Sequence, residues 1–402
     1  MFKKKKIAII GLGYVGLPLA KSFSKFFQTV GYDIDLDIVN SLNKKRNNDY
    51  VFSNDPNVIK DSNIFIITVP TPVSSNNLPD LSFLKSATKT VGKFIKKGDV
   101  VIYESTVYPG VTEDICVPIL EKFSKLKYNN DFYCGYSPER INPGDKSKSL
   151  KNIIKITSGS NKKTANFVDE LYNKIIKAGT FKVNSIKIAE ASKIVENIQR
   201  DVNIALINEF AMLFDILNIP TYEVLAAAKT KWNFADFKPG LVGGHCIGID
   251  PYYLIFKAKE LGYKAELTQI SRKINNSVSE FIVKKVKEEI KLIKNKNNCD
   301  VLILGYTFKE NFNDIRNTKV KNIVSGLNQI NCNVDIYDPL VKEDNIITKN
   351  PFVSSKKYDI FILAVAHANF FKLTKKDFEK ISKRNLVLLD LKNVYSFATW
   401  KF

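Results

Sequence analysis

Three glycines near the start of the chain constrain its fold more than any other feature. Gly11, Gly13 and Gly16 follow the apolar run KIAIIG and precede the helix-like stretch LPLAKSFSKF. In a strand–turn–helix unit, the first glycine permits the tight turn and the second lets a pyrophosphate approach the backbone. The third lets the helix pack closely on the strand. The spacing therefore predicts a dinucleotide-binding turn, with the pyrophosphate at the helix N-terminus.

The next predicted strand, at 29–33, ends in a carboxylate, Asp33. A carboxylate there bonds the adenosine ribose hydroxyls and repels the 2′-phosphate of NADP. We therefore expect NAD as the cofactor, with contacts from Gly11, Gly13, Tyr14, Val15, Gly16 and Asp33. A glycine turn that holds no ligand is the alternative interpretation.

Strand-like and helix-like segments alternate along the first part of the chain. Further strands are expected at 63–69, 99–103, 131–135 and 153–157. Amphipathic helical stretches lie between most of them, a pattern typical of a doubly wound parallel sheet.

The pattern changes twice after this first part. Within about 186–230, apolar residues recur at helical spacing over 187–218, a stretch far longer than an average helix, and a second helical stretch covers about 269–294. From about 299 the alternation of strands and helices returns, in CDVLILGY, NVDIYDP, YDIFILAVAH and LVLLDLK. We predict an α/β protein with an N-terminal Rossmann domain, a central all-helical domain and a C-terminal Rossmann-like α/β domain, over residues 1–185, 186–295 and 296–402.

Composition narrows the choice of partners. No apolar run reaches the roughly 18 residues that a membrane span needs, and the basic start MFKKKK lacks a signal-peptide cleavage site. We expect a cytoplasmic protein without a membrane partner. The net charge of +20 could attract nucleic acid, but lysine and asparagine are abundant throughout and form no compact basic patch with aromatics. We therefore expect no nucleic-acid partner.

Cysteine and histidine usage limits the metal and redox chemistry. The chain has five cysteines without CxxC spacing and only two histidines. A disulfide framework or a thiolate zinc site is not expected, so we predict no metal. A zinc alcohol dehydrogenase site or a histidine-based acid–base relay would be hard to assemble from so few histidines.

Polar residues follow two of the predicted strands. VPTP at 69–72 ends one strand, and ESTVYPG at 104–110 ends another. Ligands of open α/β sheets bind at the carboxyl ends of the strands. We therefore expect Thr71, Ser105 and Thr106 to line the cofactor, although each alone is also an ordinary turn residue.

Two further segments carry candidate site residues. SPERINPG at 137–144 offers Glu139 as a general base and Arg140 as an anion contact; an ordinary loop salt bridge is the alternative. Lys193, Asn197 and Arg200 share one face of the long predicted helix, which indicates either a polar cavity or a solvated face.

The loop KPGLVGGHCIGIDPYY at 238–253 carries the candidate nucleophile. Cys246 follows small residues and precedes a carboxylate, Asp250, by four positions. Glycines let backbone N–H groups approach a ligand, and a thiol in such a loop can act as a nucleophile. The other four cysteines lie in apolar surroundings typical of core residues. A hydride acceptor together with a thiol nucleophile suggests an oxidation that passes through a thioester.

Taken together, these segments resemble the UDP-glucose/GDP-mannose dehydrogenase family. The resemblance covers essentially the whole chain and rests on GLGYVGLPLA, VPTP, ESTVYPG, SPERINPG, AEASKIVEN…INE, PGLVGGHCIGIDPYYL and YTFKENFNDIRNTK. It implies an NAD-binding Rossmann domain, a helical dimerisation domain and a UDP-binding α/β domain. The implied partners are a UDP-sugar substrate and a second copy of the chain.

The resemblance also implies roles for matching residues. Cys246 would be the nucleophile, and Lys193 and Asn197 would stabilise oxyanions. Glu139 would activate the hydrolytic water, helped by Thr106 and Asp250. Lys309 would reach substrate phosphates and Arg316 those of the cofactor. Further substrate contacts would come from Glu139, Arg140, Lys193, Asn197, Arg200, Phe237, Lys238, Pro239, Gly240, Gly243 and Arg272.

Two segments indicate the sugar: the run RDVNIA at 200–205 and the loop at 238–253 that carries Cys246, called the thiol loop below. Both resemble the corresponding segments of family members that act on UDP-N-acetylhexosamines. We hypothesise that Arg200 lies near the 2-acetamido group and expect UDP-N-acetylglucosamine as the substrate. UDP-glucose, or the galacto- or manno-epimer of the acetylated sugar, is the first alternative. A one-step Rossmann dehydrogenase with a structural Cys246 and a nucleotide-binding scaffold are alternatives of other classes.

Overall fold

The computed structural model describes residues 5–44, 50–141, 150–293, 299–344, 346–347 and 349–402. The chain divides into two compact units. Unit 1 comprises residues 1–196 and 252–263, and unit 2 comprises 197–251 and 264–402. Within the described ranges, we find no helix with the length and apolar character that crossing a membrane requires.

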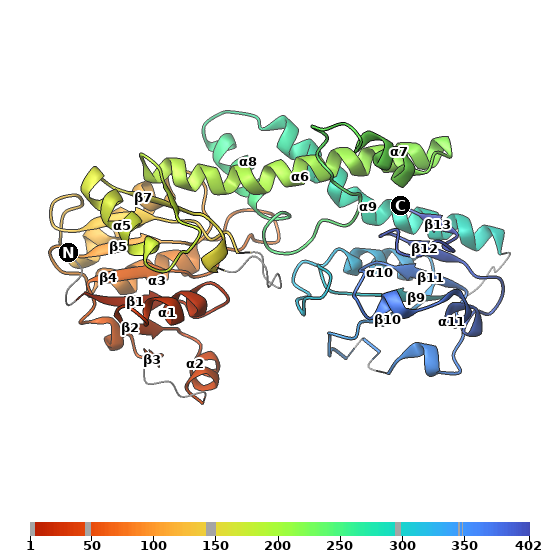
Figure 1. The fold of residues 1–402 in the computed structure, drawn as a ribbon, viewed down its shortest axis with the longest axis horizontal. Helices are drawn as coiled ribbons and strands as arrows, with labels where there is room; N and C mark the ends of the chain where they lie inside the picture. The colour runs from red at the N-terminus through yellow and green to blue at the C-terminus, as the bar shows by residue number, and fades with distance from the viewer. Residues whose placement is uncertain (1–4, 45–49, 142–149, 294–298, 345, 348) are drawn as a thin grey trace. The chain divides into compact units, whose positions relative to one another are not determined.

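Unit 1 is built on an eight-stranded sheet with the order β3-β2-β1-β4-β5-β6-β7-β8 (Figure 1). The strands are β1 (Lys6–Ile10), β2 (Gln28–Tyr32), β3 (Tyr50–Ser53), β4 (Ile64–Ile67), β5 (Val100–Tyr103), β6 (Tyr133–Tyr136), β7 (Lys155–Gly159) and β8 (Thr180–Lys182). The strand order reverses between β1 and β4, which creates a crevice at their carboxyl ends. Only the β6–β7 pair among these strands is antiparallel.

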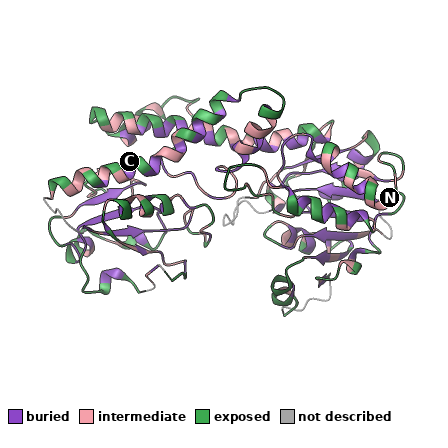
Figure 2. Cartoon of the chain, turned by 180° about the vertical axis from the view of Figure 1, so that it is seen from behind, coloured by how far each residue is buried: buried purple, intermediate pink, exposed green. Residues whose placement is uncertain are grey.

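Helices cover both faces of this sheet (Figure 1). Helices α1 (Gly16–Phe23) and α5 (Lys162–Asn173) pack through Phe23 and Leu171 on the face that carries Ile7 and Ile9. Helix α3 (Ser82–Gly92) lies on the opposite face, where its Thr88 contacts the hydroxyl of Tyr103. Helices α2 (Leu36–Asn43) and α4 (Val117–Ser124) complete the alternation. Figure 2 shows that the strands form the buried interior.

Unit 2 contains a second, five-stranded parallel sheet with the order β10-β9-β11-β12-β13. Its strands are β9 (Asp300–Leu304), β10 (Asn333–Tyr337), β11 (Ile360–Leu363), β12 (Leu388–Asp390) and β13 (Trp400–Lys401). Helices α9 (Glu266–Leu292) and α10 (Val320–Gln329) pack on the face of Val301 and Ile303. Helix α11 (Lys375–Lys380) packs on the face of Leu302 and Leu304.

The second sheet begins with the same kind of turn as the first. In unit 1 the N–H of Gly11 donates to Tyr32 O at 2.8 Å, and in unit 2 the N–H of Gly305 donates to Tyr337 O at 2.9 Å. Both glycines have positive φ, 92° and 87°. The equivalence confirms the prediction of a Rossmann-like C-terminal part.

The helical middle contains the predicted long helix. Helix α6 (Ile186–Leu217) ends before Asn218, which has a positive φ of 54°, and α7 (Thr221–Ala228) starts after Pro220. The long helical stretch predicted over 187–218 is therefore confirmed as α6, and a second, short helix follows it because proline cannot continue a helix. Helix α8 (Asp250–Glu260) follows the thiol loop. The boundaries of three domains stay a prediction.

Candidate active site

The first glycine turn is open where a dinucleotide would approach. A Cβ on Gly16 would lie 1.9 Å from Gly11 O, so only glycine lets α1 pack this closely. Among the described residues, no heavy atom lies within 4 Å of a Cβ built on Gly13. These two observations fit the close packing and the open backbone that a pyrophosphate site requires.

Asp33 is fixed beside this turn. One carboxylate oxygen accepts the N–H of Leu12 at 2.7 Å, and the other accepts the N–H of Asp35 at 3.0 Å. The carboxylate therefore sits at the end of β2 in a defined orientation. A carboxylate has further lone pairs that can accept from ribose hydroxyls.

The candidate residues after β4 and β5 contact each other. The hydroxyl of Thr71 donates to Thr106 O at 2.6 Å, and the hydroxyl of Ser105 donates to Val69 O at 2.6 Å. Tyr253 donates to Thr71 O at 2.8 Å. The two strand ends are thus locked together at the edge of the sheet where α/β ligands bind.

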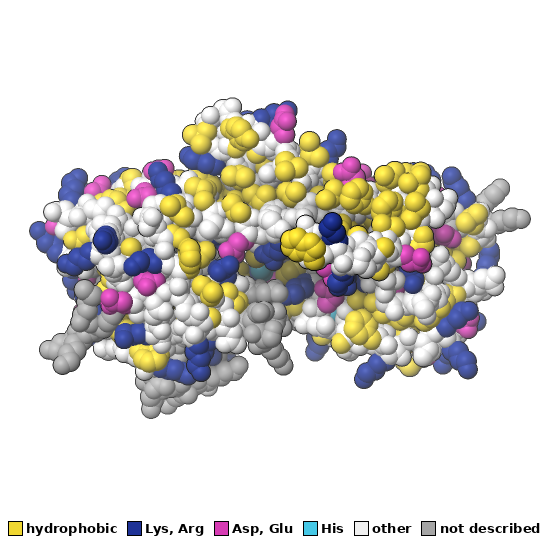
Figure 3. All heavy atoms as spheres, turned by 45° about the horizontal axis from the view of Figure 1, so that its top comes forward, with side chains coloured by type: hydrophobic (Ala, Val, Ile, Leu, Met, Phe, Trp, Pro, Cys, Tyr) yellow, Lys and Arg dark blue, Asp and Glu magenta, His cyan; other side chains and the backbone are white. Residues whose placement is uncertain are grey.

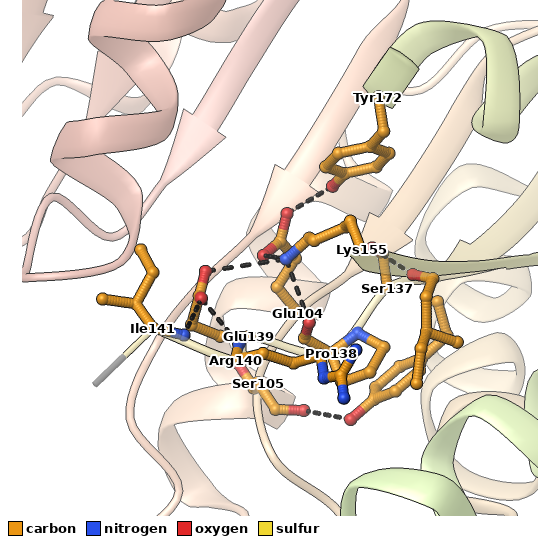
Figure 4. Close-up of polar contacts among 11 residues, drawn as sticks. Glu104, Ser105, Ser137, Pro138, Glu139, Arg140, Ile141, Lys155 and Tyr172 are labelled. Atoms are coloured by element: carbon orange, nitrogen blue, oxygen red, sulfur yellow. Dashed lines mark hydrogen bonds and ion pairs between the residues drawn. The ribbon is translucent and has the colours of Figure 1, made fainter. Parts of the chain in front are cut away.

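Glu139 lies in a buried charged cluster that the sequence did not reveal (Figure 4). Its Oε1 accepts the N–H groups of Arg140 at 2.6 Å and Ile141 at 2.5 Å. Its Oε2 faces Lys155 Nζ at 3.5 Å and makes no hydrogen bond with the described residues. One carboxylate oxygen is therefore held by backbone N–H groups, while the other faces the Lys155 cation.

Lys155 connects three parts of the sheet (Figure 4). Its ammonium donates to Glu104 at 2.6 Å and to Pro138 O at 3.0 Å, and Tyr172 donates to the other oxygen of Glu104. The side chains of Lys155 and Glu104 are 3% and 0% exposed. A buried cation of this kind requires such partners.

Burial and charge shift the proton affinities of this cluster. Burial raises the pKa of Glu104 to about 7, although the Lys155 cation acts in the opposite direction. Burial also acts to lower the pKa of Lys155, but the carboxylates of Glu104 and Glu139 outweigh it and leave this pKa raised. Lys155 therefore stays a cation across the neutral range.

Arg140 points to a different partner. Its guanidinium pairs with Glu196 at 2.9 Å and donates to Ile154 O at 2.7 Å. The loop salt bridge considered for this segment thus exists for Arg140. Glu139 instead belongs to the Lys155 cluster.

In unit 2, polar residues of α6 reach the start of α8. Asn197 is buried and donates to the carboxylate of Asp250, while Arg200 donates to the Asn197 side-chain oxygen. Lys193 lies one helical turn before Asn197 on α6, in unit 1. The structure therefore brings together Asn197 and Arg200, which are candidate substrate contacts, and Asp250, which is a candidate catalytic residue.

The loop before Cys246 is held by a network of buried side chains. Asn208 bonds both backbone groups of Gly240, accepting its N–H at 2.7 Å and donating to its carbonyl at 3.0 Å. Asn275 links Asn208 to Asp201, which also binds Arg272 at 2.5 Å. Arg272, predicted as a substrate contact, thus has a buried ion pair within unit 2, and its substrate role stays a prediction.

Cys246 differs from the other cysteines. It is half-buried, whereas Cys116, Cys134, Cys299 and Cys332 are buried. The N–H of Asp250 donates to Cys246 O at 2.9 Å, so the thiol lies one turn before the first residue of α8. The thiol loop and its carboxylate therefore form one local unit.

The remaining candidates lie in unit 2. Phe237 is half-buried, Lys238 is exposed, and Pro239, like Gly240, is buried. Gly243 packs against the segment after Arg316, where an added Cβ would lie 2.6 Å from Asn317 O. Lys309 O accepts the hydroxyl of Thr307 at 2.9 Å, and Arg316 forms an ion pair with Asp314 at 2.5 Å. Their phosphate contacts stay predictions.

Sequence reasoning missed several residues that shape these sites, chiefly Glu104, Lys155, Tyr172, His245, Asp314, Asp201 and Asn208. Lys155 is the first residue of β7 and Glu104 directly follows β5, and both strands are buried. A charged residue in a buried strand position was the available signal, since buried charges need partners. The identity of the partner of each buried charge depends on the order of the strands in the sheet. A single sequence does not reveal that order.

The fold and the glycine turn define a dinucleotide-dependent oxidoreductase with a second Rossmann-like unit. Three family models match the chain: the NAD-binding domain of the UDP-glucose/GDP-mannose dehydrogenase family at residues 44–176, its central domain at 187–277 and its UDP-binding domain at 302–397. The chain belongs to this family and is an NAD-dependent nucleotide-sugar dehydrogenase. The predicted fold class and cofactor are thereby confirmed.

Relatives cover nearly the whole chain. A UDP-N-acetyl-D-glucosamine 6-dehydrogenase of Salmonella typhi is 48% identical over 97% of this chain and 96% of its own length. An enzyme of the same name from Pseudomonas aeruginosa is also 48% identical, over 97% of each chain. The solved structure of a UDP-D-ManNAc dehydrogenase from Pyrococcus horikoshii is 31% identical, with a TM-score of 0.91 and 98% coverage of both chains.

We predict that Glu104 makes the stability of the fold depend on pH. Its folded-state pKa of about 7 exceeds the ordinary 4.5, so the folded protein retains a proton that the unfolded chain has released. The stabilisation of the folded state by this retained proton is fully present below about pH 4.5 and is lost as the pH rises through about 7. Between pH 5 and pH 8, the loss of unfolding free energy should be smaller in Glu104→Gln than in the wild type, by up to about 3 kcal/mol.

Urea unfolding at the two pH values measures this difference. Glu260→Gln, at an exposed position of α8, is the matched control and should follow the wild type. An identical pH dependence in Glu104→Gln and the wild type would contradict the raised pKa.

Proposed function

We propose that this enzyme oxidises the C6 hydroxyl of UDP-N-acetylglucosamine to the uronate, in two steps that consume two NAD. The observation that carries the proposal is the half-buried Cys246 in its glycine loop, the one cysteine of five that is not buried. The two relatives at 48% identity, both named UDP-N-acetyl-D-glucosamine 6-dehydrogenases, support the choice of substrate.

The first oxidation turns the C6 hydroxyl into an aldehyde, and the second takes place on the sugar bound to the thiol. When bound, NAD accepts the hydride that leaves C6 in each oxidation. The sulfur of Cys246 adds to the C6 aldehyde, forming a tetrahedral thiohemiacetal whose oxyanion Lys193 and Asn197 stabilise. Loss of the second hydride leaves a thioester on Cys246. The covalent link keeps the aldehyde from escaping between the two oxidations.

Glu139 completes the reaction in this proposal. Its Oε2 removes a proton from the attacking water, the C–S bond breaks, and the uronate leaves. The backbone bonds to Oε1 support this role, because they fix the carboxylate while leaving Oε2 without a hydrogen bond among the described residues. Thr106 and Asp250 would assist the water.

The open backbone at Gly13 and the oriented carboxylate of Asp33 support the cofactor contacts. Tyr14, Val15, Thr71, Ser105 and Arg316 would complete them. On the substrate, the segment from Phe237 to Gly243, with Lys309, would hold the nucleotide. The uronate would enter surface polysaccharide synthesis in the cytoplasm.

The identity of the sugar depends on Arg200 in this proposal. The hydrogen bond from Arg200 to Asn197 supports a location close to the candidate oxyanion groups. An N-acetylmannosamine epimer is a second candidate, because relatives named UDP-N-acetyl-D-mannosamine dehydrogenases are 31% and 33% identical. The higher identity to the N-acetylglucosamine enzymes favours UDP-N-acetylglucosamine as the substrate.

A panel of UDP-sugars tests this proposal. NADH formation should show two NADH per UDP-N-acetylglucosamine, with kcat/KM at least about tenfold above that for UDP-glucose. Arg200→Gln should reduce this preference, whereas Arg384→Gln, an arginine outside the candidate site, should keep it. One NADH per sugar would contradict the thioester route. Faster turnover of UDP-glucose would contradict the substrate.

The enzyme also carries an apolar helix face that fits a second copy of the chain. Leu206, Phe210, Leu213 and Leu217 follow one face of α6 and are 48%, 39%, 47% and 54% exposed. Figure 3 shows hydrophobic side chains gathered where α6 runs. Contiguous exposed apolar surface of this kind marks an interaction site. We propose a homodimer formed through this face, as the family resemblance implies.

Leu213→Glu tests the dimer. A charge in the middle of the apolar face should shift the protein from dimer to monomer, as measured by light scattering during size-exclusion chromatography. Leu292→Glu changes an equally apolar and more exposed residue, at the end of α9, and should remain dimeric. A wild type that is monomeric at all concentrations would refute the proposal.

A further inference from the structure

The thiol of Cys246 contacts the neighbouring histidine. His245 Nδ1 lies 3.2 Å from Cys246 Sγ, and His245 Nε2 lies 3.6 Å from a carboxylate oxygen of Asp314. All three residues belong to unit 2. The two histidines of the chain seemed too few for an acid–base relay, yet one of them stands between the thiol and a carboxylate.

The local backbone explains this placement. Gly244 has a positive φ of 77°, and its N–H donates to Asn317 O at 3.3 Å, three residues after Asp314. An added Cβ on Gly244 would meet the Phe308 ring at 2.6 Å. The loop can therefore press against the segment that carries Asp314 only with glycine at this position.

The carboxylate determines where the histidine proton lies. Burial acts to raise the pKa of Asp314, but the hydrogen bonds and charge of Arg316 outweigh it and leave this pKa below its ordinary value. An ionised carboxylate can only accept, and at 3.6 Å, beyond hydrogen-bond distance, its charge favours the tautomer of the neutral imidazole that carries the proton on Nε2. The lone pair of Nδ1 then faces the thiol, which donates.

We infer that His245 is the base that takes the proton from the Cys246 thiol, with Asp314 orienting the imidazole. This assignment rests on the proposed function, since it names the proton acceptor for the same nucleophile. Thiol, imidazole and carboxylate together form the arrangement that activates nucleophiles in unrelated enzymes.

Each proton and electron pair in this step has a destination. The S–H bond breaks, its proton moves to Nδ1, and the sulfur electron pair forms the bond to the aldehyde carbon. The carbonyl electron pair moves to the oxygen, and nothing is oxidised or reduced. When water later displaces the thioester, the sulfur leaves with its electron pair and the imidazolium returns the proton.

Charged groups around the pair favour the ionised state. Asp314 Oδ2 faces the imidazole, and Arg316 Nε donates to both carboxylate oxygens of Asp314, at 3.0 and 3.1 Å. Asp250 contacts Cys246 through its backbone, while its carboxylate accepts from Asn197. The Phe308 ring, 5.4 Å from the imidazole ring, contributes only packing.

Alkylation of the full chain by iodoacetamide, without substrate, tests the inference. Intact-protein mass spectrometry follows the addition, and Cys246→Ala identifies the site, because the other four cysteines are buried. The wild type should react well below the free-thiol pKa of about 8.5. His245→Gln should react at least about tenfold more slowly near pH 6.5, with its pH midpoint moved up toward that of a free thiol.

Two further variants separate chemistry from packing. Phe308→Leu, which removes a ring contact but no charge, should keep the wild-type alkylation profile. Asp314→Asn should move the alkylation profile in the same direction as His245→Gln. If His245→Gln does not fold, the profile of Asp314→Asn decides whether the histidine and its carboxylate activate the thiol. Wild-type profiles in both His245→Gln and Asp314→Asn would overturn the inference.

Failure of the inference is distinguishable from failure of the proposed function. If Cys246→Ala still converts UDP-N-acetylglucosamine to the uronate with two NADH per sugar, the thiol is not the nucleophile and the proposed function fails. If Cys246→Ala is inactive while the variants of His245 and Asp314 alkylate like the wild type, only the role of the histidine fails.

Discussion

A single buried cation connects the strand ends that carry the candidate base. Lys155 starts β7, Glu104 follows β5, and Glu139 follows β6, so one ammonium contacts the ends of two strands and the start of a third. The antiparallel pairing of β6 and β7 makes this possible, because it brings the start of β7 to the edge where β5 and β6 end. Burying the cation costs free energy, which its contacts with Glu104, Glu139 and the carbonyl of Pro138 offset.

In unit 2, a network of buried polar side chains likewise holds a functional loop in place. Asn208 holds Gly240 as a neighbouring strand would, and the buried pair of Asp201 and Arg272 anchors Asn208 through Asn275. The thiol loop is thus fixed at its start by buried polar side chains and at its end by α8. Preorganisation of this kind is what a nucleophile and its oxyanion contacts require.

The features that sequence predicted best are those set by local geometry. The glycine turn requires Gly16 because a Cβ there would meet Gly11 O, and such a requirement is visible in spacing alone. The long helix was predicted from apolar residues at helical spacing over 187–218, and α6 ends at Leu217, beside Asn218. Strands β3 and β8 were missed because they are short and partly exposed, so their apolar patterns are weak.

Contacts between distant segments could not be predicted. Lys155 and Glu104 meet through strand order, and His245 meets Asp314 through a glycine turn that packs two loops together. Counting histidines argued against a relay, because composition says nothing about which carboxylate a fold brings to a given imidazole. The charged residue in a buried strand was the one available hint.

The central claim is that Cys246 carries the sugar as a thioester that Glu139 helps to hydrolyse. Intact-protein mass spectrometry of Glu139→Gln, incubated with UDP-N-acetylglucosamine and NAD, tests it most directly. A covalent sugar adduct should accumulate on Cys246 and be absent from the variant that also carries Cys246→Ala. Unmodified enzyme throughout a reaction in which NADH is formed would rule out the thioester.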